Sequence, residues 1–359
     1  MSRLGGDEFV ILLDDLADDA LLAGRQAEVI AGKILLELDR SYEIGEIQFH
    51  NTPSIGVTLF GDRLEDTEEP LKRADTAMYQ AKAAGRNTVR FFDPMMQAAV
   101  SARLQLETDL RSAMGGAELF LLYQPQVDER GRIIGAEVLA RWEHPQRGLI
   151  SPVDFIPVAE SSGLILPLGE WIIRSACEQL RLWADQPDLA SLELAVNVSA
   201  RQFRDPEFVP IVLRILQETG VNPQRLKLEL TESMLIEGVD LVISKMKLLK
   251  AHGLGFALDD FGTGYSSLAY LKQLPFDQIK IDQSFVRDVL DDPNDAAIAR
   301  MVIVLAETLG LKVIAEGVET QAHCALLMEL GCKGFQGFYF SHPVSASAME
   351  QVMRHPRLP

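Results

Sequence analysis

Eight short apolar segments recur between positions 119 and 340, and most of them are separated by segments with helical spacing, such as 167–183 and 296–309. Their length and apolar content are typical of buried β-strands. Eight strands in roughly 240 residues are the number and size of a (β/α)8 barrel, so the pattern predicts an α/β fold with a closed TIM-like barrel. A doubly wound open sheet is the alternative, but eight strands at this chain length favour closure. The predicted strands are 119–126, 135–141, 192–199, 226–230, 255–259, 278–281, 312–315 and 337–340.

Polar side chains lie in or next to most of these predicted strands. In a barrel the carboxyl ends of the strands form one face, so side chains that are distant in sequence converge there. One carboxylate at such a place is commonly a helix cap or a surface charge, but repeated acids among aliphatic residues imply a cation that gathers them. Oxygen ligands without His or Cys favour Mg²⁺ or Mn²⁺ over zinc. The polar residues are Glu137, Asn197, Glu229, Asp259, Asp260, Lys280, Glu316 and Gln336.

Two adjacent aspartates, Asp259 and Asp260, end one predicted strand, and a glycine-containing loop follows them. As a pair at a strand end, the two aspartates could bind two metal ions, with one aspartate bridging both ions. Lys280 among the acids would balance charge and hold a water or a phosphoryl oxygen. The loop 260–268 is either a turn that requires glycines and a helix cap or a mobile loop at a catalytic rim, and its composition leaves both interpretations open.

The charge balance limits the class of partner. The chain has 34 basic and 52 acidic residues, a formal net charge of −18. A surface this acidic repels a phosphate backbone, so we expect no DNA or RNA partner. Cys177, Cys324 and Cys332 have no metal-ligand spacing and indicate buried thiols in a reducing compartment. No apolar run reaches the roughly 18 residues of a membrane-spanning helix, and no signal-peptide pattern is present. We therefore expect a cytoplasmic chain, whose parent protein could be membrane-tethered through missing N-terminal domains.

A series of short motifs runs through the barrel region. They are YQPQ at 123–126, GAEVLARW at 135–142, PVDFIPVA at 152–159, NVS at 197–199, ELTES at 229–233, DDFGTGYSSL at 259–268, KID at 280–282, EGVET at 316–320 and GFQG at 334–337. In order and spacing over about 117–359 they resemble the EAL-domain family, which comprises phosphodiesterases of the bacterial messenger cyclic di-GMP, and GAEVLARW is similar to the signature of that family.

The resemblance implies hydrolysis of cyclic di-GMP to the linear dinucleotide pGpG at a site with two metal ions, Mg²⁺ or Mn²⁺. It also implies a homodimer formed through the EAL domain. The implied metal ligands are Glu137, Asn197, Glu229, Asp259 and Asp260, with Asp259 shared between the ions. The implied catalytic residues are Glu316, Lys280, Gln336 and Glu232. Glu316 and Lys280 would act on the attacking water, and Glu232 would brace the loop 261–267. The implied substrate contacts are Arg141, to a phosphate, and Gln126.

One departure concerns the motif that names the family, Glu-Ala-Leu, because Val138 stands here at the second position. Valine suits a strand, and its side chain alternates away from Glu137, so the metal ligand stays in place. All the acids, Lys280 and the loop are present, which favours an active phosphodiesterase over an inactive cyclic di-GMP receptor. A metal-dependent barrel acting on carbon acids is a further alternative, against which Arg141 and the loop argue.

The N-terminal part resembles a second family, the GGDEF diguanylate cyclases, through LGGDEF at 4–9 and ADTAMYQAKAAGRN at 74–87. A hairpin needs a strand before its turn, and only residues 1–4 precede this one. We therefore expect a truncated α/β GGDEF portion without cyclase activity, in a fragment of a longer signalling protein. Apolar residues at i, i+4 spacing from 96 to 114 predict a connecting helix. The expected organisation is a partial GGDEF domain at 1–92, a connecting helix at 93–114 and an EAL barrel at 115–359.

Overall fold

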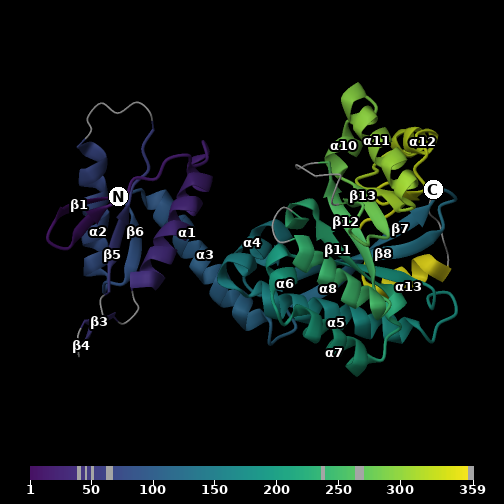
Figure 1. The fold of residues 1–359 in the computed structure, drawn as a ribbon, viewed down its shortest axis with the longest axis horizontal. Coiled ribbons are helices and arrows are strands. Elements are labelled where there is room, and N and C mark those ends of the chain that lie inside the picture. The colour runs from purple at the N-terminus through teal and green to yellow at the C-terminus, as the bar shows by residue number, and fades with distance from the viewer. Residues whose placement is uncertain are drawn as a thin grey trace. The chain divides into compact units, whose positions relative to one another are not determined.

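The computed structural model describes residues 1–38, 42–44, 47–49, 52–61, 68–235, 239–262 and 271–354. The chain divides into two compact units, Met1–Thr108 and Asp109–Pro359 (Figure 1). No helix among the described residues is long and apolar enough to cross a membrane. Positions 263–268 of the loop predicted at 260–268 lie outside the described residues.

The first unit contains short two-stranded sheets and helices. Its GGDEF-like run forms an antiparallel hairpin of β1 (Ser2–Gly5) and β2 (Glu8–Val10), in which Gly6 has a φ of 52°. The other elements are α1 (Ala20–Leu38), the antiparallel pair β3 (Tyr42–Ile44) and β4 (Ile47–Phe49), and the parallel pair β5 (Ser54–Val57) and β6 (Thr88–Phe91) with α2 (Glu69–Ala83) between them. Ala27 and Phe91 form a small core against which Val57 and Val89 pack. The core of this unit is therefore small.

The division between the units falls inside one helix, α3 (Pro94–Ala113). It begins at a proline, which is favourable in the first turn of a helix because no amide hydrogen is needed there. Leu104 is exposed, whereas Leu110 and Ala113 in the last turn are buried. The end of α3 is thus packed within the second unit.

The second unit is a closed barrel of eight strands, as the spacing of apolar segments predicted. The ring order is β10-β11-β12-β13-β14-β15-β7-β8, and a pairing between β8 and β10 closes it. Most pairs are parallel, but β7 runs antiparallel to both β8 and β15. The strands are β7 (Leu119–Asp128), β8 (Ile133–His144), β10 (Glu193–Val198), β11 (Leu226–Thr231), β12 (Gly255–Phe261), β13 (Gln278–Ile281), β14 (Lys312–Ala315) and β15 (Gly334–Phe335), and β9 (Gly148–Ile150) pairs with β8 as a hairpin.

The last predicted strand, 337–340, is wrong, because that segment is a turn and the strand is the two-residue β15 before it. The amides of Phe340 and Ser341 both donate to the carbonyl oxygen of Gly337, at 3.1 Å each. A Cβ atom placed on Gly337 would lie 2.1 Å from the carbonyl oxygen of Val318. The chain therefore turns where the backbone of Gly337 packs directly against the backbone of Val318.

Helices surround the barrel (Figure 1). Their buried apolar side chains supply the outer layer of its core. In α5, for example, Leu168, Ile172, Ala176 and Leu180 are all buried at i, i+4 spacing. The helices are α4 (Pro152–Ser162), α5 (Ile165–Trp183), α6 (Ala200–Arg204), α7 (Phe208–Thr219), α8 (Val239–Ala251), α10 (Gln283–Arg287), α11 (Pro293–Leu309), α12 (Gln321–Glu329) and α13 (Ala346–Arg354), with 3-10 turns at Pro223–Arg225 and Glu232–Leu235.

The barrel interior is polar along several strands. In β11, Lys227 and Glu229 alternate with Leu226, Leu228 and Leu230, and all five are buried. Because successive side chains of a strand point to opposite faces, the leucines face the helices and the polar residues face the barrel axis. This alternation places the candidate site residues inside the ring of strands.

Candidate active site

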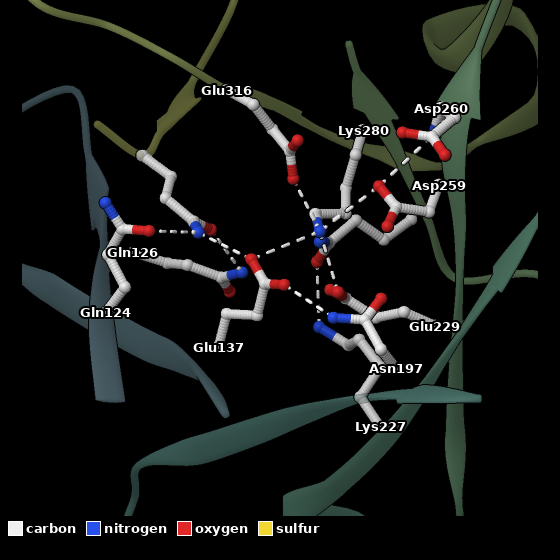
Figure 2. A network of polar contacts seen from close by, with 12 residues as sticks. Gln124, Gln126, Glu137, Asn197, Lys227, Glu229, Asp259, Asp260, Lys280 and Glu316 are labelled. Carbon is white, nitrogen blue, oxygen red and sulfur yellow. Dashed lines mark hydrogen bonds and ion pairs between the residues drawn. The ribbon is translucent and has the colours of Figure 1, made fainter. Parts of the chain in front are cut away.

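Side chains from successive barrel strands meet around the ammonium of Lys280, which is 1 % exposed on β13 (Figure 2). Asp259 comes from the adjacent strand β12, Glu229 from β11 and Glu137 from β8 on the opposite side of the ring, and Glu316 directly follows the adjacent strand β14. The distances from Lys280 Nζ are 3.4 Å to Glu137 Oε2, 2.7 Å to Glu229 Oε2, 3.2 Å to Asp259 Oδ1 and 2.5 Å to Glu316 Oε1. The structure therefore brings together acids that are separated by up to 179 positions (316 − 137) in the sequence.

This cluster has four carboxyl groups around one ammonium. Burial alone would lower the pKa of Lys280, but the surrounding acids, Asp259 first, raise it well above its ordinary value. Burial raises the pKa of Glu229 to about 8 and that of Glu316 well above its usual range, and the other carboxylates add to both effects. A single ammonium thus leaves the acids incompletely compensated.

Glu137 is the acid that the site holds most firmly in its charged form. Burial opposes its ionisation, but Lys280 and hydrogen bonds outweigh burial, and the pKa of Glu137 lies below its usual value. Asn197 Nδ2 on β10 donates to Glu137 Oε1 at 2.6 Å, and Gln336 Nε2 donates to Glu137 Oε2 at 2.6 Å. Because Asn197 uses its amide nitrogen here, its carbonyl oxygen stays available for another contact.

Asp260 differs from the other acids in its backbone. Its φ is 55°, in the left-handed region, and the register of β12 against β13 is irregular between Leu258 and Phe261. Its amide donates to Asp259 Oδ1 at 3.1 Å. Burial, together with the charges of Asp259 and Asp282, raises the pKa of Asp260 to about 6. Asp259 contacts Lys280 and Asp260 lies beside Asp259 (Figure 2), whereas a regular strand would point the two side chains to opposite faces.

Gln336, which contacts Glu137, links two further glutamine side chains to the site. Gln336 Nε2 also donates to Gln124 Oε1 at 3.1 Å, and Gln126 Nε2 donates to Gln336 Oε1 at 2.9 Å. Gln124 and Gln126 are two positions apart on β7, so both face the barrel interior. Sequence reasoning did not single out Gln124, although it lies in the YQPQ run.

Two further predicted residues lie at the edge of the cluster. Arg141 is part-buried on β8, burial lowers its pKa, and the charge of Glu137 partly offsets that effect. Glu232 is buried, and its Oε2 accepts from the amide of Gly262 at 3.1 Å, where the described part of the loop ends. Glu232 Oε1 has no hydrogen-bond partner within the described part of the chain.

The donor set suits a hard divalent cation. All the candidate ligands offer oxygen, and Glu229 Oε1 is buried without a hydrogen-bond partner among the described residues. The acids converge on Lys280 Nζ, and the described ranges contain no three His, Cys, Asp or Glu side chains already grouped to hold a metal. Binding of a cation would therefore require some acids to turn from Lys280 toward it.

Fold and site together define a TIM-like barrel with an acid-rich centre near the carboxyl ends of its strands. The chain belongs to the EAL domain family, whose model matches residues 107–343. A second model, for the GGDEF domain of diguanylate cyclases, matches residues 1–88. The family resemblance read from the sequence motifs is therefore confirmed.

Named relatives and solved structures agree with this assignment. The chain is 42 % identical over 352 residues to the bifunctional diguanylate cyclase/cyclic di-GMP phosphodiesterase MucR of Pseudomonas aeruginosa, covering 97 % of this chain and 50 % of MucR. It is 40 % identical over 351 residues to the cyclic di-GMP phosphodiesterase PdeR of Escherichia coli, covering 98 % of this chain and 52 % of PdeR. The chain thus spans about half the length of these relatives.

Among solved structures, the PaMucR phosphodiesterase in complex with c-di-GMP is 46 % identical with a TM-score of 0.66, covering 68 % of this chain and 99 % of that one. The EAL enzyme Bd1971 with cAMP and cyclic di-GMP bound is 33 % identical with a TM-score of 0.69, covering 81 % of this chain and 76 % of that one.

Proposed function

We propose that this chain hydrolyses cyclic di-GMP to linear pGpG in bacterial second-messenger signalling. The observation that carries the proposal is the convergence of Glu137, Glu229, Asp259 and Glu316 on Lys280 in a barrel of the EAL family. The names of MucR and PdeR, which specify cyclic di-GMP phosphodiesterases, support the substrate. An inactive receptor is the alternative, but every acid of the site is present and gathered.

The residues fit two divalent cations, Mg²⁺ or Mn²⁺. Glu137, Asn197, Glu229 and Asp259 would hold one ion, and Asp259 and Asp260 would hold the second. When bound, the cations would supply positive charge that polarises the water and the scissile phosphodiester. The buried, unpartnered oxygen Glu229 Oε1 and the excess of carboxylates over ammonium support this assignment.

Glu316 is the proposed proton acceptor. Its raised pKa makes it a stronger base than an ordinary carboxylate, which suits removal of a proton from the attacking water. Lys280, 2.5 Å from Glu316 Oε1, would hold that carboxylate in place and stabilise the water as it loses its proton. Water attacks phosphorus in line, one P–O3′ bond breaks, and the released 3′ oxygen takes up a proton.

Other residues would bind substrate or support the site. The Arg141 guanidinium would hold a phosphate of the substrate, which its part-buried position near Glu137 allows. Glu232 would anchor the start of the loop 261–267 through the amide of Gly262. Gln336 would orient Glu137 through the 2.6 Å hydrogen bond.

We also propose the organisation around this activity. The partial GGDEF domain would be 1–92, the connecting helix 93–114 and the EAL barrel 115–359, and the barrel would form a homodimer. The matches to the GGDEF and EAL models support the order of these parts. The proposed location is cytoplasmic.

One assay tests the activity. The protein is incubated with cyclic di-GMP and Mg²⁺, with and without EDTA, and the nucleotides are separated by chromatography. Mg²⁺-dependent formation of pGpG supports the enzyme, and binding without product supports the receptor. A matched control is Glu193→Ala. Glu193 forms an ion pair with Lys227 near the amino ends of β10 and β11, away from the carboxyl ends where the site lies, so this substitution should not affect turnover.

A further inference from the structure

The amide of Gln336 has a fixed direction in the barrel. Its nitrogen donates to Glu137 Oε2 and to Gln124 Oε1, and its oxygen accepts from Gln126. Gln124 is itself fixed, because its Nε2 donates to the carbonyl oxygen of Ser341 at 3.3 Å. A reversed Gln336 would place its carbonyl oxygen against the Glu137 carboxylate, and two acceptors repel each other. Correct orientation therefore depends on a donor that occupies Gln336 Oε1.

Gln126 supplies that donor and lies away from any open surface. It is 3 % exposed on β7, and its Nε2 donates to Gln336 Oε1 at 2.9 Å. A Cβ atom placed on the facing Gly135 of β8 would lie 3.3 Å from Gln126 Oε1, so the adjacent strand confines the side chain. A buried amide held between two strands is poorly placed to contact a substrate, which is the role that the family resemblance implied for it.

We propose that Gln126 is a positioning residue that orients Glu137 as a metal ligand through Gln336. The inference rests on the proposed function for the identity of the metal site. Gln126 donates to Gln336, and Gln336 donates to Glu137, so the effect of Gln126 on Glu137 passes through one intermediate side chain. Removing a residue that orients a metal ligand through hydrogen bonds typically lowers metal affinity or activity 10- to 100-fold.

The test separates this role from substrate binding by a double-mutant cycle. The variants are Gln126→Met, which keeps the shape and removes the donor, Gln336→Met and the double variant, all in the full chain. Mn²⁺ affinity is measured by calorimetry without nucleotide, and kcat and KM for cyclic di-GMP are measured at saturating Mn²⁺. Gln278→Met is the matched control, because Gln278 is equally buried in the barrel and bonds to Lys227 instead.

We expect Gln126→Met to weaken Mn²⁺ binding by about 10-fold or more, with KM within about twofold of wild type. In the Gln336→Met background the same change should alter Mn²⁺ affinity by less than about twofold, because coupled residues are not additive. The Gln278→Met control should bind Mn²⁺ as wild type does. If Gln126→Met is unfolded at the assay temperature, Gln126→Asn is used in its place. This substitution shortens the side chain by one methylene and so moves the amide donor away from Gln336 Oε1.

Three results would overturn the proposal. They are a raised KM with unchanged Mn²⁺ affinity, additive effects in the double variant, and an equal loss of affinity in the Gln278→Met control. A wild-type chain that binds no Mn²⁺ overturns both this inference and the proposed metal site. A wild-type chain that binds Mn²⁺ without hydrolysing cyclic di-GMP overturns only the proposed function, and the cycle on Mn²⁺ affinity still decides the role of Gln126.

Discussion

Replacing Lys280 by Met should destabilise the metal-free protein strongly above neutral pH. The ammonium is 1 % exposed and lies within 3.4 Å of an oxygen of each of four carboxylates, so solvent cannot screen the charges that it leaves behind. Removing one partner of a buried ion pair costs about 3–5 kcal/mol. At roughly 2–4 °C per kcal/mol for a domain of this size, Tm should fall by roughly 6–20 °C.

The loss of stability in Lys280→Met should depend on pH, since the carboxylates can take up protons when the ammonium is absent. The folded-state pKa of Glu229 is raised to about 8, so its neutral form stabilises the fold at low pH and that contribution is lost as the pH rises through about 8. Without Lys280 the acids are less compensated, and the variant should approach wild-type stability near pH 5.

Thermal melts followed by circular dichroism in EDTA at pH 5 and pH 8 measure this difference. Lys227→Met is the matched control, because Lys227 is a buried barrel lysine with one carboxylate partner, Glu193 at 3.0 Å. The fall in Tm on replacing Lys227 by Met should be smaller and nearly independent of pH. An equal Tm for Lys280→Met and wild type at pH 8, or an equal loss at both pH values, would refute the electrostatic reasoning.

Three further predictions concern catalysis and metal binding. Glu137→Ala should abolish Mg²⁺-dependent turnover while circular dichroism shows a folded barrel, and undiminished pGpG formation on chromatography would contradict the ligand assignment. Glu316→Gln should lower kcat by about 10²- to 10⁴-fold and retain cyclic di-GMP binding by calorimetry, because it removes only the proton acceptor; a kcat near that of wild type would exclude Glu316 as the base. Calorimetric titration with Mn²⁺ should give two ions per chain in wild type and close to one in Asp260→Ala, and a single ion in wild type would rule out the shared site.

The strands that were predictable from sequence are those with a continuous apolar pattern. β13 and β14 have the predicted bounds, because their aliphatic residues alternate with or follow polar ones over four positions and the composition then changes. β15 could not be located this way, since two residues carry no periodicity. The aromatic run after Gly337 has strand-like composition, but the chain turns there, where Gly337 packs against the backbone of Val318, a residue distant in the sequence. The antiparallel direction of β7 likewise leaves no mark on its own residues.

The identity of the site residues was more predictable than their contacts. Glu137, Glu229 and Asp259 could be found because acids are rare within aliphatic strands. The sequence did not indicate that all of them would contact Lys280, which depends on how the register of β11, β12 and β13 aligns their inward positions. The positive φ of Asp260 coincides with a register irregularity between two strands, and the hydrogen bond from Gln126 to Gln336 joins residues that are 210 positions apart. Such features are set by tertiary packing.

The charge of the assembled site argues for two divalent ions rather than one. With cations bound, Glu137, Glu229, Asp259, Asp260 and Glu316 would each carry a negative charge, and Lys280 would offset one of the five. One divalent ion would leave two negative charges facing a dianionic cyclic dinucleotide, which would be repelled. Two divalent ions bring the sum to zero (−5 + 1 + 4), and Arg141 then makes the surroundings positive where a phosphate must bind. A chain with a net charge of −18 can therefore attract this anion only where the acids have been used to collect cations.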